Sequence, residues 1–268
     1  MKKNVGFIGC GNMGGALARA TAAAIGGEQV YLCDAYKEKA KELAQQIGAS
    51  VCELNELAQQ CDYIFLGVKP QMIEAMFEEF RPSLDKRNGT CTLISMAAGV
   101  SIAAVQKMAG DNVPIIRIMP NTPVAVGEGM ILYNYNAIVT DEQIGDFKTI
   151  LSKAGRVDKL DESKIDAASA ISGCGPAYVY MFAEALADGA VACGLPRDNA
   201  NLYAAQTLMG AAKLLMESGK HPGALKDAVC SPGGTTIAGV RALENGGFRA
   251  AAMNAVIAAY DKTMELKK

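Results

Sequence analysis

The motif Gly9-Cys10-Gly11-Asn12-Met13-Gly14 constrains the fold more than any other feature of the sequence. It follows directly on an apolar run, Asn4–Ile8, and it opens a helical pattern, Met13–Ala24. Glycine at the first position permits a tight turn, the second lets the backbone approach a pyrophosphate, and the third lets helix and sheet pack closely. The motif predicts a dinucleotide site at a helix N-terminus, although glycines that only punctuate a turn are the plain alternative.

The first 160 residues alternate short apolar runs with helical patterns. The runs are Asn4–Ile8, Gln29–Cys33, Tyr63–Val68, Thr92–Met96 and Val113–Met119, with a further strand expected near Met130–Tyr133. The helical patterns are Met13–Ala24, Lys37–Gln46, Asn55–Cys61, Met72–Arg81, Ser101–Met108 and Asp141–Ala154. Uninterrupted apolar strands separated by helices indicate a parallel sheet covered on both faces. We therefore expect an α/β, doubly wound Rossmann domain over residues 1–160.

Residues 161–268 read as all-helical. The expected helices are Lys164–Ser172, Pro176–Cys193, Arg197–Ser218, Gly234–Glu244 and Phe248–Lys268. The helix Pro176–Cys193 has only Glu184 and Asp188 as charged residues, and a helix without a polar face has to be covered on every side. We expect part of that cover to come from a second subunit, which makes this a dimerisation domain.

Composition excludes several partners. The chain has 268 residues, 50% of them hydrophobic, and a net charge of −2, so no basic field is present to hold nucleic acid. No apolar stretch is long enough for a membrane span. The apolar segment at the N-terminus breaks at once into glycines and Asn12, which does not fit a signal peptide. We expect a cytoplasmic protein.

The cysteines and the single histidine limit the chemistry. Eight cysteines are present without a C-x-x-C pair, and His221 is the only histidine. We therefore expect no metal site and reduced, structural cysteines. Histidine is the most common general acid or base in enzymes. Any enzyme hypothesis for this chain therefore has to explain catalysis with one histidine at most.

Two features near the first motif leave the choice of dinucleotide open. Asp34 lies about 20 residues after Gly14, at the end of the second apolar run, where an acid suits the 2′-hydroxyl of NAD. Tyr36, Lys37 and Lys39 follow it and could bind a 2′-phosphate if Asp34 turns away, or could simply be the solvated start of a helix.

Further loops follow the later strands. Val68-Lys69-Pro70 and Ala97-Ala98-Gly99 come after the third and fourth runs, where loops face the ligand crevice. Asn121, between two prolines, could point into the same crevice. In the helical part, Ser231-Pro232-Gly233-Gly234-Thr235-Thr236 precedes a helix and offers N–H groups and hydroxyls to a small carboxylate. A surface lysine, tight turns and an ordinary N-cap are the alternatives for these loops.

Over its whole length the chain resembles pyrroline-5-carboxylate reductases. The resemblance is carried by the N-terminal glycine-rich motif, Val68-Lys69-Pro70, Ala97-Ala98-Gly99-Val100, Met119–Pro123, Ser172–Tyr178 and the stretch Pro222–Glu244. It implies reduction of the C=N bond of 1-pyrroline-5-carboxylate to L-proline, the last step of proline biosynthesis, with NADPH or NADH as cofactor and NADPH slightly favoured. It also implies a homodimer with the active site at the subunit interface, and leaves room for a larger ring of dimers.

The resemblance assigns roles to individual residues. Substrate contacts are expected at Ser231, Gly234, Thr235 and Thr236, with Thr236 as the catalytic residue that hydrogen-bonds the ring nitrogen. Together with Asp34, the expected cofactor contacts are Ile8, Gly9, Cys10, Gly11, Asn12, Met13, Asn55, Val68, Lys69, Pro70, Ala97, Ala98 and Gly99. Asp34 departs from the Ser, Asn or Arg often found there in the family.

Two other functions fit parts of the pattern. A 3-hydroxyacid-type dehydrogenase on the same plan needs a lysine base in the helix after Gly175, and that helix contains none. A non-catalytic, dinucleotide-sensing dimer would keep the first motif but would not need Ser231–Thr236. A cyclic imine can arrive already protonated, so a reductase of this kind needs orientation more than a strong acid.

Overall fold

The computed structural model describes residues 3–87, 89 and 91–266. The strands are β1 Val5–Ile8, β2 Val30–Cys33, β3 Ser50–Val51, β4 Tyr63–Leu66, β5 Thr92–Ser95, β6 Ile115–Met119, β7 Gly129–Tyr135 and β8 Gly155–Lys159. The helices are α1 Asn12–Ile25, α2 Lys37–Ile47, α3 Leu54–Gln60, α4 Ile73–Asp85, α5 Ile102–Ala109, α6 Asp141–Ile150, α7 Ile165–Ser172, α8 Gly175–Ala192, α9 Arg197–Ser218, α10 Pro222–Val229, α11 Thr235–Asn245 and α12 Phe248–Leu266. Four 3₁₀ turns lie between them: η1 Gly27–Gln29, η2 Pro70–Met72, η3 Thr122–Val126 and η4 Glu162–Lys164.

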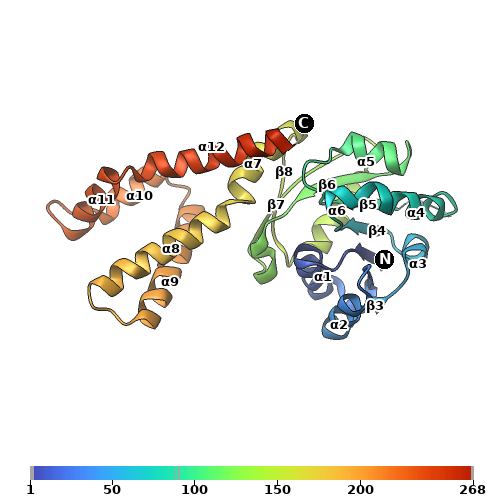
Figure 1. The fold of residues 1–268 in the computed structure, drawn as a ribbon, viewed down its shortest axis with the longest axis horizontal. Coiled ribbons are helices and arrows are strands. Elements are labelled where there is room, and N and C mark those ends of the chain that lie inside the picture. The colour runs from blue at the N-terminus through green and yellow to red at the C-terminus, as the bar shows by residue number, and fades with distance from the viewer. Residues whose placement is uncertain (1–2, 88, 90, 267–268) are drawn as a thin grey trace. The chain divides into compact units, whose positions relative to one another are not determined.

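The chain divides into two compact units, Met1–Gly173 with Lys262–Lys268, and Cys174–Asp261. The first contains the sheet and the second is helical, so the expected fold class, an α/β dinucleotide-binding sheet followed by an all-helical domain, is confirmed (Figure 1). This division falls after α7, because α7 contacts β7 and belongs to the first unit. The expected functional division at residues 160 and 161 stays a prediction.

The sheet of the first unit has the strand order β3-β2-β1-β4-β5-β6-β7-β8. Side chains of one strand alternate between two cores, as the geometry of a strand requires. In β4, Tyr63 and Phe65 pack with α1, α2 and α6, whereas Ile64 and Leu66 pack with α3, α4 and α5. Phe7 of β1 stacks on Phe65 with the ring centres 4.5 Å apart. Apolar runs without alternation thus reflect burial on both faces.

One edge of the sheet departs from the parallel arrangement of the other strands. β7 runs antiparallel to β6, and β8 pairs parallel with β7. β6 ends at Met119 and β7 begins at Gly129, with only η3 between them. A parallel return needs a crossover of roughly a dozen residues or more, so this short connection brings the chain back in the opposite direction. The five apolar runs do form neighbouring parallel strands, and the sequence predicted no direction for the further strand near Met130–Tyr133.

Three further details were missed from the sequence. β8 is an edge strand with mostly exposed side chains, so it shows no apolar run. α10 is a short helix in which Pro222 occupies the first turn and the Nδ1 of His221 accepts a hydrogen bond from the Gly223 N–H at 3.1 Å. α4 continues past Arg81 to Asp85 although Pro82 lies inside it, since the proline removes one N–H near the helix end.

A buried ion-pair cluster ties β6 to the segment after β8. Arg117 is 2% exposed and donates to Glu162 at 3.0 Å and to Asp166 of α7 at 3.3 Å. Glu162 also accepts a hydrogen bond from the Ile102 N–H, at 2.7 Å, at the start of α5. The cluster therefore fixes the end of the loop that follows β5.

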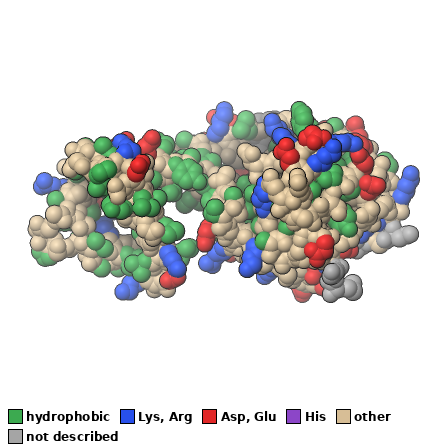
Figure 2. All heavy atoms as spheres, turned by 90° about the horizontal axis from the view of Figure 1, so that it is seen from below, with side chains coloured by type: hydrophobic (Ala, Val, Ile, Leu, Met, Phe, Trp, Pro, Cys, Tyr) green, Lys and Arg blue, Asp and Glu red, His purple; other side chains and the backbone are tan. Residues whose placement is uncertain are grey.

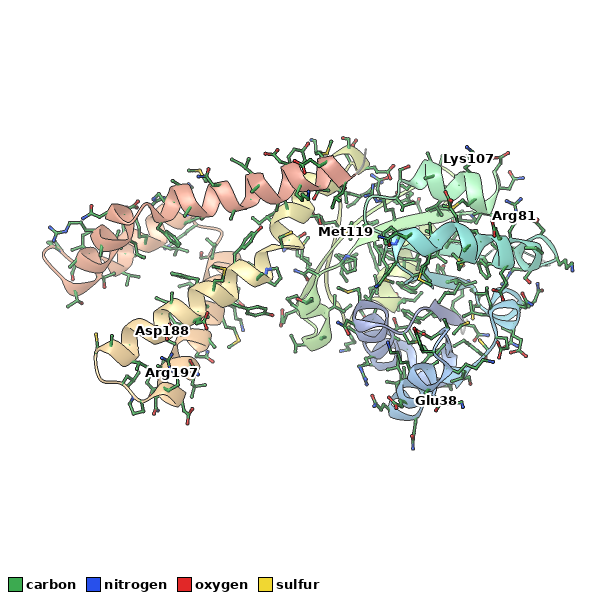
Figure 3. The ribbon with its side chains drawn as sticks, viewed as in Figure 1. Glu38, Arg81, Lys107, Met119, Asp188 and Arg197 are labelled. Carbon is green, nitrogen blue, oxygen red and sulfur yellow. The ribbon has the colours of Figure 1, made fainter. Side chains whose placement is uncertain are left out.

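The helical unit has almost no core of its own. All of residues 174–261 are described, and only Ala187, Ala200 and Ala204, where α8 meets α9, are buried. An ion pair between Asp188 of α8 and Arg197 of α9, 2.6 Å apart, joins the same two helices (Figure 3). Hydrophobic side chains gather on the surface of this unit (Figure 2), among them Val179, Tyr180, Met181, Leu202, Met209, Leu214, Met216, Met253 and Ile257. Within the described residues, no helix is long and apolar enough to cross a membrane.

The Arg117 cluster leads to a prediction about stability. Arg117→Ala removes the cation beside the buried Asp166 carboxylate, and breaking a buried pair costs about 3 kcal/mol or more. We expect a loss of that size in the free energy of unfolding, measured by urea denaturation. Lys41→Ala, which breaks the exposed pair with Glu38, is the control and should cost less than about 1 kcal/mol. Equal losses in the two variants would contradict the buried role of Arg117.

Candidate dinucleotide and carboxylate sites

The glycine-rich loop joins β1 to α1, and each glycine has a distinct environment. Gly9 has a φ of +98°, and a Cβ there would lie 2.6 Å from the Gly67 carbonyl oxygen. A Cβ at Gly14 would lie 2.1 Å from the Gly9 oxygen, so the helix packs directly against the turn. A Cβ at Gly11 would meet no described atom within 4 Å. The turn and the close packing thus need Gly9 and Gly14, while the space at Gly11 is open.

The N-terminus of α1 is suited to an anion. Gly11 is the N-cap, no side chain among the described residues caps the helix, and the first turn carries no acid. Gly11 and Asn12 are exposed, Met13 is half-buried, and Ile8 is buried at the end of β1. Unbonded N–H groups at a helix start favour negative charge. The loop therefore fits the pyrophosphate of a dinucleotide, with the space at Gly11 available for it.

Asp34 follows β2 and contacts this loop. Its Oδ2 accepts a hydrogen bond from the Cys10 N–H at 2.6 Å, and its Oδ1 accepts one from the Tyr36 N–H at 2.8 Å. The carboxylate is half-buried. Asp34 therefore lies beside the glycine-rich loop, and the contact expected between Asp34 and the ribose stays a prediction.

A cavity of about 340 Å³ lies beside the same loop. It is bounded by α1, α2 and η3, and its lining includes Gly11, Arg19, Lys39 and Glu42. Cations and an acid thus both face this space, so its charge is mixed.

The loops after β4 and β5 follow the strands at their carboxyl ends. Lys69 is exposed, forms no ion pair with any described residue, and precedes η2, which begins at Pro70. Ala97 is buried, whereas Ala98 and Gly99 are exposed, and Gly99 has a φ of +77° with open space around it. Parallel strands place such loops at the ligand edge of a sheet. Val68, Lys69, Pro70 and the Ala97–Gly99 turn are therefore available to a dinucleotide.

Two asparagines serve the fold. Asn121 is 9% exposed, donates to the Ser172 oxygen at 2.9 Å and accepts from the Met130 N–H at 2.8 Å. The idea that Asn121 points into a crevice was wrong, because both ends of its amide bind the neighbouring backbone. Asn55 lies in the first turn of α3, where its Oδ1 accepts a hydrogen bond from Ser83 at 2.6 Å. The cofactor role expected for Asn55 stays a prediction.

The loop before α11 lies in the helical unit. Gly234 is the N-cap, Gly233 has a φ of +68°, and the Gly234 N–H donates to the Ser231 oxygen at 3.0 Å. A Cβ at Gly234 would lie 2.4 Å from the Ser231 Oγ, so a side chain there would displace that hydroxyl. Ser231, Thr235 and Thr236 are exposed, and their hydroxyls bond to no group that the structure describes. Three hydroxyls and the amides of a helix start are therefore free for a small anion.

Two cysteine thiols of the sheet unit, Cys10 and Cys33, are kept protonated by their surroundings. All eight cysteines are free thiols. Burial, with a smaller contribution from Asp34, raises the pKa of the Cys10 thiol to about 12, and burial raises that of Cys33 to about 11. These thiols are neutral at physiological pH. Among the described residues, no group of three or more His, Cys, Asp or Glu side chains could hold a metal ion.

The two parts of the chain match known protein families. Residues 162–266 match the family described as pyrroline-5-carboxylate reductase dimerisation, and residues 4–99 match the family described as NADP oxidoreductase, coenzyme F420-dependent. The chain is 42% identical to the pyrroline-5-carboxylate reductase of Escherichia coli K12, and the alignment covers 100% of both chains.

Solved structures agree with these sequence matches. The pyrroline-5-carboxylate reductase of Coxiella burnetii is similar with a TM-score of 0.91 at 31% identity, covering 100% of both chains. The Plasmodium falciparum pyrroline carboxylate reductase, solved with NADP bound, has a TM-score of 0.87 at 34% identity, also over 100% of both chains.

The glycine loop yields a prediction that separates binding from folding. Gly11→Ala places a methyl group in open space, so the free energy of unfolding should change by less than about 0.5 kcal/mol. Its affinity for a reduced dinucleotide should fall at least about tenfold, because the methyl group occupies the space of the pyrophosphate. Titration of nicotinamide fluorescence and thermal unfolding measure the two effects.

Two other glycines provide matched controls. Gly14→Ala overlaps the Gly9 oxygen and should cost more than about 2 kcal/mol of stability. Gly145→Ala in α6 meets nothing within 4 Å and should leave both stability and dinucleotide affinity intact or slightly raise stability. Unchanged dinucleotide binding by Gly11→Ala would remove the pyrophosphate from this loop.

Proposed function

Because the chain belongs to the pyrroline-5-carboxylate reductase family, we propose that it reduces 1-pyrroline-5-carboxylate to L-proline with the loop Ser231–Thr236 as its substrate cradle. The observation that carries the assignment of the loop is the start of α11, where, among the described residues, no side chain caps the helix and the hydroxyls of Ser231, Thr235 and Thr236 are unbonded, so donors remain for a carboxylate. NADH or NADPH supplies the hydride when bound. The reaction is the last step of proline biosynthesis.

The chain holds the substrate at its two polar groups. Backbone N–H groups of Thr235 and Thr236 lie at the positive end of α11 and bind the substrate carboxylate, with the Ser231 hydroxyl beside them and Gly234 as the N-cap that lets the carboxylate approach. No acid in the first turn of this helix competes for those donors. The Thr236 hydroxyl accepts the N–H of the protonated ring nitrogen. These contacts fix the C=N carbon relative to the cofactor.

The reaction then balances without a protein acid. Hydride adds to the imine carbon, the π electrons of the C=N bond move to nitrogen, and the proton already on nitrogen remains there as the amine N–H. Both electrons of the new C–H bond would come from the reduced nicotinamide held by the glycine-rich loop. Correct placement of two reactants can contribute roughly 7–11 kcal/mol to lowering a barrier. A site without histidine is sufficient for this chemistry, and the single histidine, His221, caps α10.

The cofactor contacts proposed from the sequence differ in whether their polar groups are already hydrogen-bonded within the chain. The glycine-rich loop, Asp34, Lys69 and the Ala97–Gly99 turn all have groups available to a dinucleotide. Asn55 is proposed with less support, since its oxygen is bonded to Ser83.

The quaternary structure follows from the helical domain. A dimerisation domain is present at residues 162–266, and its exposed apolar side chains support a homodimer. We place the active site at the subunit interface of that dimer, and a larger ring of dimers remains a prediction. Eight free thiols are compatible with the expected cytoplasmic location.

The reaction itself is the first test. Mixing the protein with 1-pyrroline-5-carboxylate and NADH or NADPH should lower the nicotinamide absorbance at 340 nm and produce L-proline in equal amount. Omission of the imine is the control. Dinucleotide binding without any loss of absorbance would support the non-catalytic, dinucleotide-sensing dimer instead. The hydroxyacid dehydrogenase needs a lysine that α8 does not contain.

The role of Thr236 is tested by a pair of variants. Thr236→Ala should lower kcat/KM for the imine about 10- to 100-fold, because a hydrogen bond to a charged group contributes roughly 1.5–3 kcal/mol. Thr236→Ser keeps the hydroxyl and should retain most of the activity. Steady-state kinetics and dinucleotide titration measure the effects, and dinucleotide affinity should not change. Kinetics of Thr236→Ala equal to those of the unaltered protein would exclude the role.

A further inference from the structure

The carboxylate of Asp34 is held in one position by the backbone. One oxygen accepts the Cys10 N–H of the glycine-rich loop at 2.6 Å, and the other accepts the Tyr36 N–H at 2.8 Å. Two donors from separate segments leave little freedom for the side chain to rotate. Asp34 therefore faces the glycine-rich loop and does not turn away from it.

The same carboxylate retains capacity for a ligand. An ionised carboxylate has about four acceptor positions, and the two backbone donors use two of them. An acid at the end of the second strand of such a domain accepts hydrogen bonds from the ribose 2′-hydroxyl of NAD. A 2′-phosphate has no such hydroxyl and carries between one and two negative charges at neutral pH, so the fixed carboxylate repels it.

The cations that follow Asp34 are engaged elsewhere. The ammonium of Lys37 is bonded to Glu53, the N-cap residue of α3. The ammonium of Lys39 lies over the ring of Tyr36, 5.3 Å from its centre. In the cavity beside the glycine-rich loop, Arg19 and Lys39 share the lining with Glu42. Of the two lysines, Lys37 is thus paired with an acid, and the cations that line the cavity face it together with Glu42.

We propose that this chain uses NADH in preference to NADPH and that Asp34 is the residue that sets the preference. The inference rests on the proposed function, because it concerns the dinucleotide of that reaction. It reverses the slight preference for NADPH that the family resemblance implies. Asp34 then has two roles. It accepts a hydrogen bond from the loop amide, and it discriminates between the 2′-hydroxyl of NADH and the 2′-phosphate of NADPH.

Binding measurements on the full chain test the proposal without relying on turnover. Isothermal titration with NADH, NADPH, 5′-AMP and adenosine 2′,5′-bisphosphate gives the affinity for each ligand with and without the 2′-phosphate. The unaltered protein should bind NADH at least tenfold more tightly than NADPH, with the same order for the two adenosine ligands. In Asp34→Ser, which removes the charge but keeps a hydroxyl, the ratio of affinities should fall at least tenfold.

Glu38→Gln is the matched control, because it removes one negative charge from exposed Glu38 in the first turn of α2. Its NADH-to-NADPH ratio should stay within twofold of the original. Equal or tighter binding of NADPH by the unaltered protein, or a ratio unchanged in Asp34→Ser, would overturn the inference. Efficient imine reduction with NADPH alone would do the same while leaving the proposed function intact. Failure with both dinucleotides would remove the proposed function itself.

Discussion

The helical unit cannot bury its own apolar surface, and this constraint determines how the protein has to work. Between Cys174 and Asp261 only three alanines are buried, while large side chains such as Tyr180, Met181 and Met216 are more than half exposed. Large apolar side chains exposed in such number on one unit are typical of an interaction surface. A second copy of the same dimerisation domain is the natural cover. Because the loop Ser231–Thr236 belongs to this unit, we infer that dimerisation also stabilises the substrate cradle.

The sheet unit does bury its own apolar surface, because side chains of the same chain cover both faces of the sheet. Alternate residues of each central strand supply two separate cores, and the Arg117 cluster fixes the start of α5 and therefore the end of the Ala97–Gly99 turn. A rigid frame of this kind places loops at the edge of the sheet with little entropy left to lose. The proposed cofactor site thus belongs to the self-sufficient sheet unit, and the proposed substrate cradle belongs to the dependent helical unit.

The features that could be predicted from the sequence are those that depend on patterns among residues close together in the chain. The glycine motif follows from the needs of one turn, and the buried strands follow from uninterrupted apolar runs, so both were found. β8 was missed because only Val157 of its five residues faces an apolar neighbourhood. The reversal of β7 depends on the length of one connection, and the burial of Asn121 depends on Ser172 and Met130, which lie elsewhere in the chain. Likewise, the orientation of Asp34 is decided by an amide 24 residues away. Long-range partners of polar side chains leave no periodic signal in the sequence.

The proposed sites for the two reactants share one feature, a helix N-terminus that no described side chain caps. α1 and α11 each have a glycine as N-cap, Gly11 and Gly234, and each lacks an acid in the first turn. By contrast, α5 and α6 have Ser101 and Thr140 as N-caps, and the side chain of each accepts a hydrogen bond from its own helix. A capping side chain occupies one of the free N–H groups of the first turn, whereas a glycine N-cap leaves that N–H group to a ligand. One such end suits the pyrophosphate of the dinucleotide and the other suits the carboxylate of the imine acid. In the proposed function both reactants are bound through their anionic groups, so backbone amides would align them without a catalytic histidine.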